Sequence, residues 1–285
     1  MYNLIFTNSR GQELDFTKII DSQILSISGL EPTTAETTEE TNPLIDGVTF
    51  GTIRRGKRNI VVNIAQYGLR IKEIRRNLYN VLGGKENGQL RFIDENIDVS
   101  TSAYIENILP TQWTNAPTLS ISILCESAFF ESTVTKKTRV VSLENKLSFP
   151  LELTEQGQEF GELVTENALI VNNNGQEKTP CHIKLVFNGA VENPVITNNT
   201  MNEYFSLIRT FSSGQVVDIY SDIGQKRAIL TDIDGTETDI FSDISISSSW
   251  LFLKLGENII SVSSAKGIEN VVTEIEFKEL FYGVD

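Results

Sequence analysis

The sequence has 285 residues, of which 40% are hydrophobic and 22% charged, so its composition is close to that of globular proteins and excludes wholesale disorder. Its length predicts about two domains. With 24 Lys and Arg against 38 Asp and Glu, the formal net charge is −14. Such an acidic chain is a poor candidate for wrapping nucleic acid, whose affinity comes mainly from neutralised phosphates.

No membrane-crossing segment is expected. No apolar run approaches the ~18 residues that would span a bilayer, and the run at 250–255 is broken by Lys254. The N-terminus has no basic region followed by an apolar block, so no secretory signal is visible. We therefore expect the protein to fold and act without crossing a membrane by itself.

Opposite charges are separated along the N-terminal half. Strand-like runs at 4–8 and 24–28 are followed by an acidic segment, 31–46, with five acids, five threonines and no base. The basic motif RRGKR follows at 54–58, and residues 47–91 hold ten basic and two acidic residues. This pattern fits either a hairpin arm with an acidic tip and a basic stem or an ordinary exposed loop. The charge separation favours self-association or an acidic partner.

Residues 71–82 predict a helix. Apolar residues recur at helical spacing on one face, basic residues occupy the other, and Gly83-Gly84 supplies a stop. A helix laid against a sheet, with its basic side in solvent, is the simplest interpretation. The apolar positions are Ile71, Ile74, Leu78 and Leu82, and the basic ones are Lys72, Arg75 and Arg76.

Strand-like runs bounded by turn residues continue along the chain, which is typical of an all-β sandwich architecture. Their rhythm breaks at 132–146, so we place the two domains at 1–138 and 139–285. Each half closes with an aromatic pair, Phe129-Phe130 and Phe281-Tyr282, an echo too weak to define a repeat. The runs lie at 59–67, 118–125, 147–153, 168–173, 181–187, 203–210, 215–220, 227–233, 250–255, 258–263 and 271–277.

Cysteine and histidine offer little catalytic chemistry. Cys181 and His182 are neighbours in an alternating strand, so they point to opposite faces and cannot form a thiol–imidazole pair. We expect Cys181 and Cys125 in the core and His182, the only histidine, on the surface. Two cysteines and one histidine are too few for a usual zinc site.

Other chemical motifs are equally weak. The Asp-rich stretch 231–240 lacks the spacing of a calcium loop, and a β-turn at Asp234-Gly235 explains it better. No pair of carboxylates is singled out for glycoside hydrolysis, and Gly-rich phosphate loops and Gly-x-Ser-x-Gly elbows are absent from the sequence. We therefore expect neither enzymatic activity nor a cofactor.

A series of short motifs resembles the distal tail protein family of long-tailed (siphovirus-type) phages and prophage tail-like particles. In that family an Asn-x-Gly segment, a Gly…Asn-Pro turn and a Trp-x-x-Leu…Gly-x-Asn run occur in this order, and an Asp-Gly-x-x-x-Gly motif precedes a basic strand in the N-terminal half. The matching residues here are Asn173 and Gly175; Gly189 with Asn193-Pro194; Trp250, Leu253, Gly256 and Asn258; and Asp46, Gly47 and Gly51.

The resemblance implies a mainly β, two-domain protein. Its N-terminal domain would be β-sandwich-like with one helix and a projecting hairpin, and its C-terminal domain a galectin-like β-sandwich. Members form a hexameric ring that joins the tail tube to the baseplate or tail tip and acts as an assembly hub. The implied partners are the tail tube, tape measure and tip or tail-associated lysin proteins and, in some relatives, receptor-binding proteins, within a virion tail assembled in the bacterial host cytoplasm.

Head-to-tail ring closure needs two different complementary surfaces on each subunit, and a basic segment with an acidic loop could supply them. A host receptor- or carbohydrate-binding tail protein is the alternative, for which an exposed Trp would be the signature; Trp113 and Trp250 fit core positions better. A tail-associated hydrolase is a third hypothesis. The candidate interaction residues are Arg54, Arg55, Lys57, Arg58, Arg75, Arg76, Glu36, Glu39 and Glu40.

Overall fold

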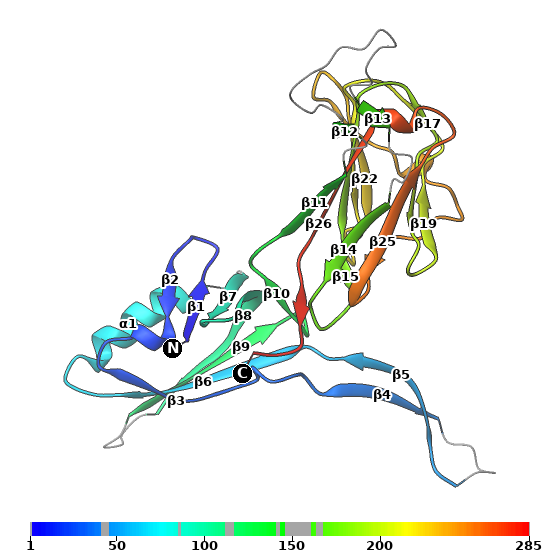
Figure 1. The fold of residues 1–285 in the computed structure, drawn as a ribbon. Helices are drawn as coiled ribbons and strands as arrows, with labels where there is room; N and C mark the ends of the chain where they lie inside the picture. The colour runs from blue at the N-terminus through cyan, green and yellow to red at the C-terminus, as the bar shows by residue number, and fades with distance from the viewer. Residues whose placement is uncertain are drawn as a thin grey trace. The chain divides into compact units, whose positions relative to one another are not determined.

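A computed structural model describes residues 2–40, 46–84, 87–111, 117–140, 143–145, 161–163 and 168–284 (Figure 1). The fold is mostly β, as the sequence predicted. The chain divides into two compact units, the first formed by Met1–Val134 with Leu280–Asp285 and the second by Thr135–Glu279. The strand expected at 147–153 and the environment of Trp113 lie outside the described residues.

The first unit is built on one large antiparallel sheet with the order β2-β1-β7-β8-β9-β6-β3, to which β10 and β27 add at β8. In β9 every second residue is buried, from Leu119 to Cys125, because successive side chains of a strand point to opposite faces. The strands are β1 (Asn3–Thr7), β2 (Glu13–Asp15), β3 (Ser22–Ser28), β6 (Arg58–Gln66), β7 (Gly88–Ile93), β8 (Asp98–Pro110), β9 (Thr118–Cys125), β10 (Phe130–Ser132) and β27 (Leu280–Phe281).

The helix α1 (Ile71–Leu82) confirms the prediction from its periodicity. It buries Leu78 and Leu82 in the core of the first unit, with Ile74 packed against the same cluster. The helix ends at Gly83, whose backbone N–H donates to the carbonyl of Tyr79. A short 3₁₀ helix, η1 (Phe16–Lys18), also contributes a buried Phe16, and the Asp15 side chain caps its N-terminus.

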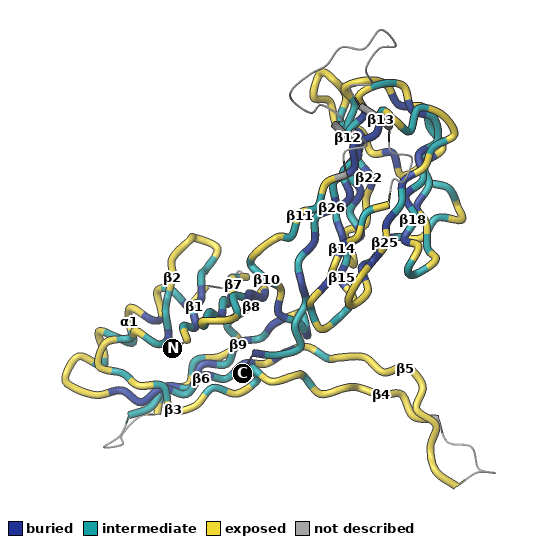
Figure 2. Tube along the Cα trace, in the orientation of Figure 1, coloured by how far each residue is buried: buried dark blue, intermediate teal, exposed yellow. Residues whose placement is uncertain are grey.

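Strands β4 (Ala35–Glu40) and β5 (Thr49–Arg55) form a separate two-stranded antiparallel ribbon, which we call the arm. Of the two interpretations left open by the sequence, the hairpin is therefore the one observed. Every residue of β5 is exposed, and the arm carries the exposed colour along both strands in Figure 2. The arm thus contributes nothing to the core of the unit.

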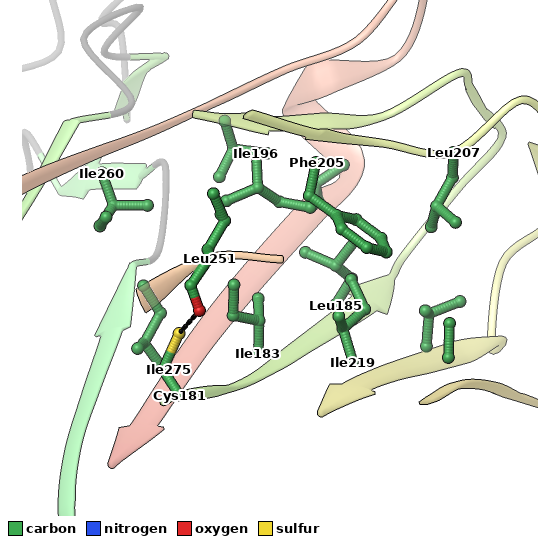
Figure 3. Close-up of a cluster of buried hydrophobic side chains, with 14 of the residues drawn as sticks. Cys181, Ile183, Leu185, Ile196, Phe205, Leu207, Ile219, Leu251, Ile260 and Ile275 are labelled. Atoms are coloured by element: carbon green, nitrogen blue, oxygen red, sulfur yellow. Dashed lines mark hydrogen bonds between the residues drawn. The ribbon is translucent and has the colours of Figure 1, made fainter. Parts of the chain in front are cut away.

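The second unit is a β-sandwich of a six-stranded and a four-stranded antiparallel sheet, with the orders β11-β26-β16-β21-β22-β23 and β14-β25-β18-β19. Alternate residues of β16 point inward, and Figure 3 shows Cys181, Ile183 and Leu185 among the buried side chains of the core. The principal strands are β11 (Lys136–Val140), β14 (Ala168–Asn173), β16 (His182–Phe187), β18 (Val195–Asn198), β19 (Glu203–Ser206), β21 (Val216–Tyr220), β22 (Arg227–Thr231), β23 (Glu237–Asp239), β25 (Gly256–Ser263) and β26 (Val271–Phe277).

Short elements complete the second unit. The expected strand at 250–255 is a strand only over its middle two residues. These elements are β12 (Leu143–Asn145), β13 (Gly161–Leu163), β15 (Thr179–Pro180), β17 (Val191–Glu192), β20 (Thr210–Phe211), β24 (Phe252–Leu253), η2 (Phe241–Asp243) and η3 (Ile268–Asn270).

The second unit is an insertion into the first, which differs from the expected division at 138. The chain leaves the first unit after β10 and returns to it at β27. These two strands pair, with Phe130 opposite Phe281. The expected second domain therefore loses its last residues, 280–285, to the first unit. The reason is pairing across the chain: the two aromatic pairs noted in the sequence are partners and not a repeat, since Phe129 and Tyr282 also lie with ring centroids 5.5 Å apart.

Candidate interaction surfaces

One face of the arm carries the exposed apolar side chains of Phe50 and Ile53 beside Thr37 and Glu39, and we call it the apolar face. Thr37 lies opposite Ile53 and Glu39 opposite Phe50, with a bulge between the two pairs. Residues two apart in a strand share a face, and so do residues directly opposite each other. Phe50 and Ile53 therefore lie on the same side of the arm, where their side chains are 57% and 65% exposed.

The opposite face of the arm is polar and internally paired. Glu36 lies opposite Arg54, and the Arg54 Nη2 atom is 2.8 Å from Glu36 Oε2 while Nε donates a second hydrogen bond of 3.0 Å. Both side chains are more than half exposed, so solvent screening limits the pair to about 0–1 kcal/mol. The basic and acidic residues expected to meet neighbouring subunits thus partly neutralise each other within one arm.

The remaining charged residues of the arm lie near its ends. Glu39 is exposed, and Glu40 closes β4 opposite Thr49. The Arg55 guanidinium donates to the carbonyl of Thr33 and lies 4.9 Å from the centroid of the Tyr282 ring. Lys57 is exposed between the two strands β5 and β6. These positions leave Glu39, Arg55 and Lys57 accessible to a partner.

Arg58 contradicts the expectation of an exposed basic motif, because it is fully buried. Its charge is surrounded by carbonyl dipoles and by the ring of Phe130, whose centroid lies 4.4 Å from the guanidinium carbon. Burial lowers the pKa of this guanidinium from its ordinary value. Arg58 therefore cannot meet an acidic partner. Its backbone acceptors are the carbonyls of Gly29, Glu31 (2.7 Å), Ala128 (2.8 Å) and Tyr282.

The two arginines proposed on the helix also differ. Arg75 is half-buried, and its Nε donates to Gln66 Oε1 at 2.6 Å, so this side chain ties the helix to the end of β6. Its Nη2 approaches two carbonyls at 3.4 Å, those of Thr111 and Thr118. Arg76 is exposed on the solvent side of α1. Of these two arginines, Arg76 is therefore the one that presents its charge to solvent as the sequence analysis expected.

The thiols and the histidine are placed in separate environments. Cys125 and Cys181 are buried and free of disulfides, as the strand pattern predicted, and burial raises the pKa of their thiols to about 11 and about 12. Cys181 contacts the carbonyl of Leu251 inside the core (Figure 3). His182 lies on the opposite face of the strand, where its Nε2 is 2.8 Å from Asp218 Oδ1.

The remaining motifs are structural in character. The backbone N–H of Gly235 donates to the carbonyl of Asp232, which confirms the turn predicted there. Trp250 is partly buried against the core, with its ring centroid 5.1 Å from that of Phe205, as predicted. Across the described segments of the chain, no group of three or more His, Cys, Asp or Glu residues is arranged to hold a metal ion. Nor does any described helix have the length and apolar character needed to cross a membrane.

The apolar face of the arm is the feature that sequence reasoning missed. Phe50 and Ile53 are three residues apart in the sequence, and plain strand alternation would place them on opposite faces. The bulge reverses that alternation. Gly51, which lies inside the bulge, was the available signal, because an isolated glycine within a strand pattern often marks one.

Comparison with known proteins finds a likeness between part of the chain and phage tail components. Residues 174–281 match the family described as siphovirus-type tail component, C-terminal domain, which confirms the resemblance to distal tail proteins noted in the sequence. No curated protein matches the chain.

Solved structures extend the likeness to the whole chain. The crystal structure of the phage SPP1 Dit (gp 19.1) protein, described as a paradigm of hub adsorption apparatus in phages infecting Gram-positive bacteria, has a TM-score of 0.70 at 15% identity over 99% of both chains. Baseplate structures of phage p2 in its activated conformation with Ca and with Sr have TM-scores of 0.50 and 0.52 at 11% and 10% identity, each over 98% of both chains. These likenesses are of fold.

Proposed function

We propose that the protein is a structural hub of the distal tail or baseplate, because residues 174–281 match the family described as siphovirus-type tail component, C-terminal domain. Six copies form a ring that joins the tail tube to the baseplate or tail tip. The ring lies in the virion tail and assembles in the cytoplasm of the bacterial host.

The family match is the observation that carries this proposal, and the whole-chain fold likeness extends its support to the first unit. The burial of Cys125 and Cys181 does not suit a nucleophilic role for either, because catalytic cysteines need accessible thiolates. The partners proposed from the family are the tail tube, tape measure and tip or lysin proteins.

Ring closure requires two different complementary surfaces on one subunit, because each copy contacts its neighbours head to tail. We assign the arm to one of them. An isolated two-stranded hairpin is at best marginally stable in water, and this one exposes Phe50 and Ile53 on the same side. Packing that face against a neighbour would both order the arm and bury its apolar side chains.

The charged residues lie at the rim of this contact and help to orient the two subunits. Exposed ion pairs contribute little energy singly, but complementary charges favour the correct register and speed association. Arg58 and Arg75 are no longer proposed as interaction residues, because their guanidinium groups form hydrogen bonds within the chain. The residues that remain as proposed partners of a neighbouring subunit are Arg54, Arg55, Lys57, Arg76, Glu36, Glu39 and Glu40.

The test is to make the apolar face of the arm polar and to measure assembly. We expect Ile53→Ser with Phe50→Ser to shift the concentration for ring formation at least about tenfold, since each substitution removes apolar burial. Ile170→Ser in β14 is the matched control, because Ile170 is 61% exposed in the second unit. Equal assembly of the arm variant and the control would overturn the role of the arm.

A further inference from the structure

The C-terminal segment, residues 280–284, lies against both connections of the arm to its sheet; we call this segment the strap. The connections are residues 29–34, between β3 and β4, and residues 56–57, between β5 and β6. In Figure 1 the strap, at the red end of the chain, runs from β27 toward the point where the chain leaves β3 for the arm. The contacts described below all lie within the first unit.

The strap packs tightly on the first connection. The backbone N–H of Val284 donates to the carbonyl of Leu30 at 3.0 Å, as a strand would. Gly283 has no room for a side chain, because a Cβ there would lie 2.7 Å from the carbonyl oxygen of Leu30 and 3.0 Å from Cδ of Pro32. Glycine is therefore required by the close approach of the two backbones.

The strap also binds the second connection. Arg58, which follows this connection directly, donates to the carbonyl of Tyr282 and to the carbonyls of Gly29 and Glu31 on the first connection. A planar guanidinium has donors in a fixed fork, so one buried side chain sets the geometry of the strap and of the first connection at once. On the exposed side, Arg55 lies over the ring of Tyr282.

The strap is held in turn by the core. Phe281 pairs with Phe130 of β10, and Val284 is buried in the hydrophobic cluster of the first unit. The strap is also the continuation of β26 through residues 278–279, so the chain that leaves the second unit runs directly into it. Its position within the first unit is therefore defined by packing against this core.

We propose that the strap fixes the direction of the arm, with Arg58 as the positioning residue. Without the strap, the two short connections between the arm and strands β3 and β6 would lose the contacts of Val284, Gly283 and Tyr282 described above. The use of this direction in ring closure rests on the proposed function, but the direction itself is a property of a single chain.

The experiment measures the direction of the arm in dilute single chains by pulsed electron spin resonance between labels at Thr52→Cys in β5 and Asn77→Cys in α1. Both positions are exposed, whereas the native Cys125 and Cys181 are buried and resist labelling. The test variant is Gly283→Ala. Gly84→Ala is the matched control, because a Cβ at Gly84 meets nothing within 4 Å.

We expect Gly283→Ala to widen the distribution of distances between the labels at least about twofold, and Gly84→Ala to leave it unchanged, because loss of anchoring contacts releases local motion. The same width in both variants would overturn the proposal. Labelling of Cys125 reports whether the first unit has unfolded. Should Gly283→Ala expose Cys125, Tyr282→Ala decides the question: it removes the ring that contacts Arg55 and Phe129 but keeps the backbone of the strap, and an unchanged width would overturn the proposal.

The result of this experiment can be distinguished from the result of the test of the proposed function. A wider distribution in a protein that never forms rings would support the strap and contradict the ring. If the distribution of distances is the same in Gly283→Ala and the control, and the protein forms normal rings, the ring is supported and the role of the strap is contradicted.

Discussion

Arg54 and Glu36 face each other across the two strands of the arm, with Nη2 of the arginine 2.8 Å from Oε2 of the glutamate. The pair connects the acidic segment to the basic motif that the sequence showed as separate charge zones. Part of the charge proposed to hold neighbouring subunits together is therefore balanced within each subunit, and a test of the interface must separate the two effects.

The first prediction uses charge reversal to separate pairing within one arm from attraction between neighbouring subunits. Arg54→Glu with Glu36→Arg keeps the pair within the arm but reverses the charge of each position, whereas Arg54→Glu with Lys57→Glu removes the pair and adds four negative units. We expect both variants to be folded, since exposed pairs contribute about 0–1 kcal/mol.

Only assembly should distinguish these variants from the parent chain. We expect both to weaken ring formation in low salt, the second variant more strongly, and we expect raised salt to reduce the difference. Sedimentation over a series of salt concentrations measures this. If both variants form unaltered rings at every salt concentration, the charges of the arm face solvent and do not contribute to the contact between subunits.

The second prediction concerns the buried guanidinium of Arg58. Arg58→Met removes the donors of four backbone carbonyls, of which that of Ala128 is in a buried hydrogen bond and the other three are in part-buried ones. Since a buried acceptor without a partner costs about 1–3 kcal/mol, we expect the free energy of unfolding of the first unit to fall by about 2 kcal/mol or more. Arg54→Met is the control and should cost less than about 1 kcal/mol. Urea unfolding measures both, and equal losses would contradict the account of Arg58.

The third prediction revises the expected surface role of His182. Its side chain is 22% exposed, hydrogen-bonded to Asp218, and stacked on Tyr220 with ring centroids 4.2 Å apart. We expect His182→Ala to lower the free energy of unfolding of the second unit by about 1 kcal/mol and to leave assembly intact. Lys184→Ala, on the same face of β16, serves as the control. A loss of assembly without loss of stability would instead indicate a functional role for the imidazole.

The fourth prediction follows from the pairing of Arg91 with Asp98, whose guanidinium and carboxylate form hydrogen bonds of 2.8 and 2.6 Å. This pairing holds the pKa of Asp98 below its ordinary value. Because the folded pKa is the lower one, the pair stabilises the fold above the ordinary carboxyl range, and that contribution is lost as the pH falls through the folded pKa.

Removing the partner should raise the pKa of Asp98. We expect Arg91→Met to do so in an NMR titration of the carboxyl groups. Asp94 is an internal control, since backbone N–H groups of Asn96 and Ile97 lower its pKa and do not depend on Arg91. A pKa of Asp98 that stays low in Arg91→Met would show that the arginine is not its cause.

Local periodicity predicted much of the fold. The helix at 71–82 and the burial of Cys125 and Cys181 follow from spacing along a single segment, so the sequence sufficed for them. Pairing between distant segments was not accessible in the same way. In the sequence, the aromatic pairs that contain Phe130 and Phe281 were visible only as a weak similarity between the two halves. In the structure these two residues pair, and residues 280–285 therefore belong to the first unit and not to the second.

The interaction surface was predicted less well, for a related reason. Charge in the RRGKR motif is visible in the sequence, but burial is decided by the neighbouring backbone. Arg58 begins the core strand β6 and faces inward, whereas Arg54 lies in the exposed arm. The apolar side of the arm depends on one extra residue in β5, and a bulge of this kind becomes certain only when the register is known.

The central claim is tested most directly by the mass of the species that forms in solution as the concentration of purified protein is raised. Sedimentation equilibrium should show the 31.8 kDa chain giving way to a closed assembly of six copies, about 190 kDa, because head-to-tail contacts that close on themselves end at a fixed number. A dimer that remains the end point at every concentration would contradict the ring.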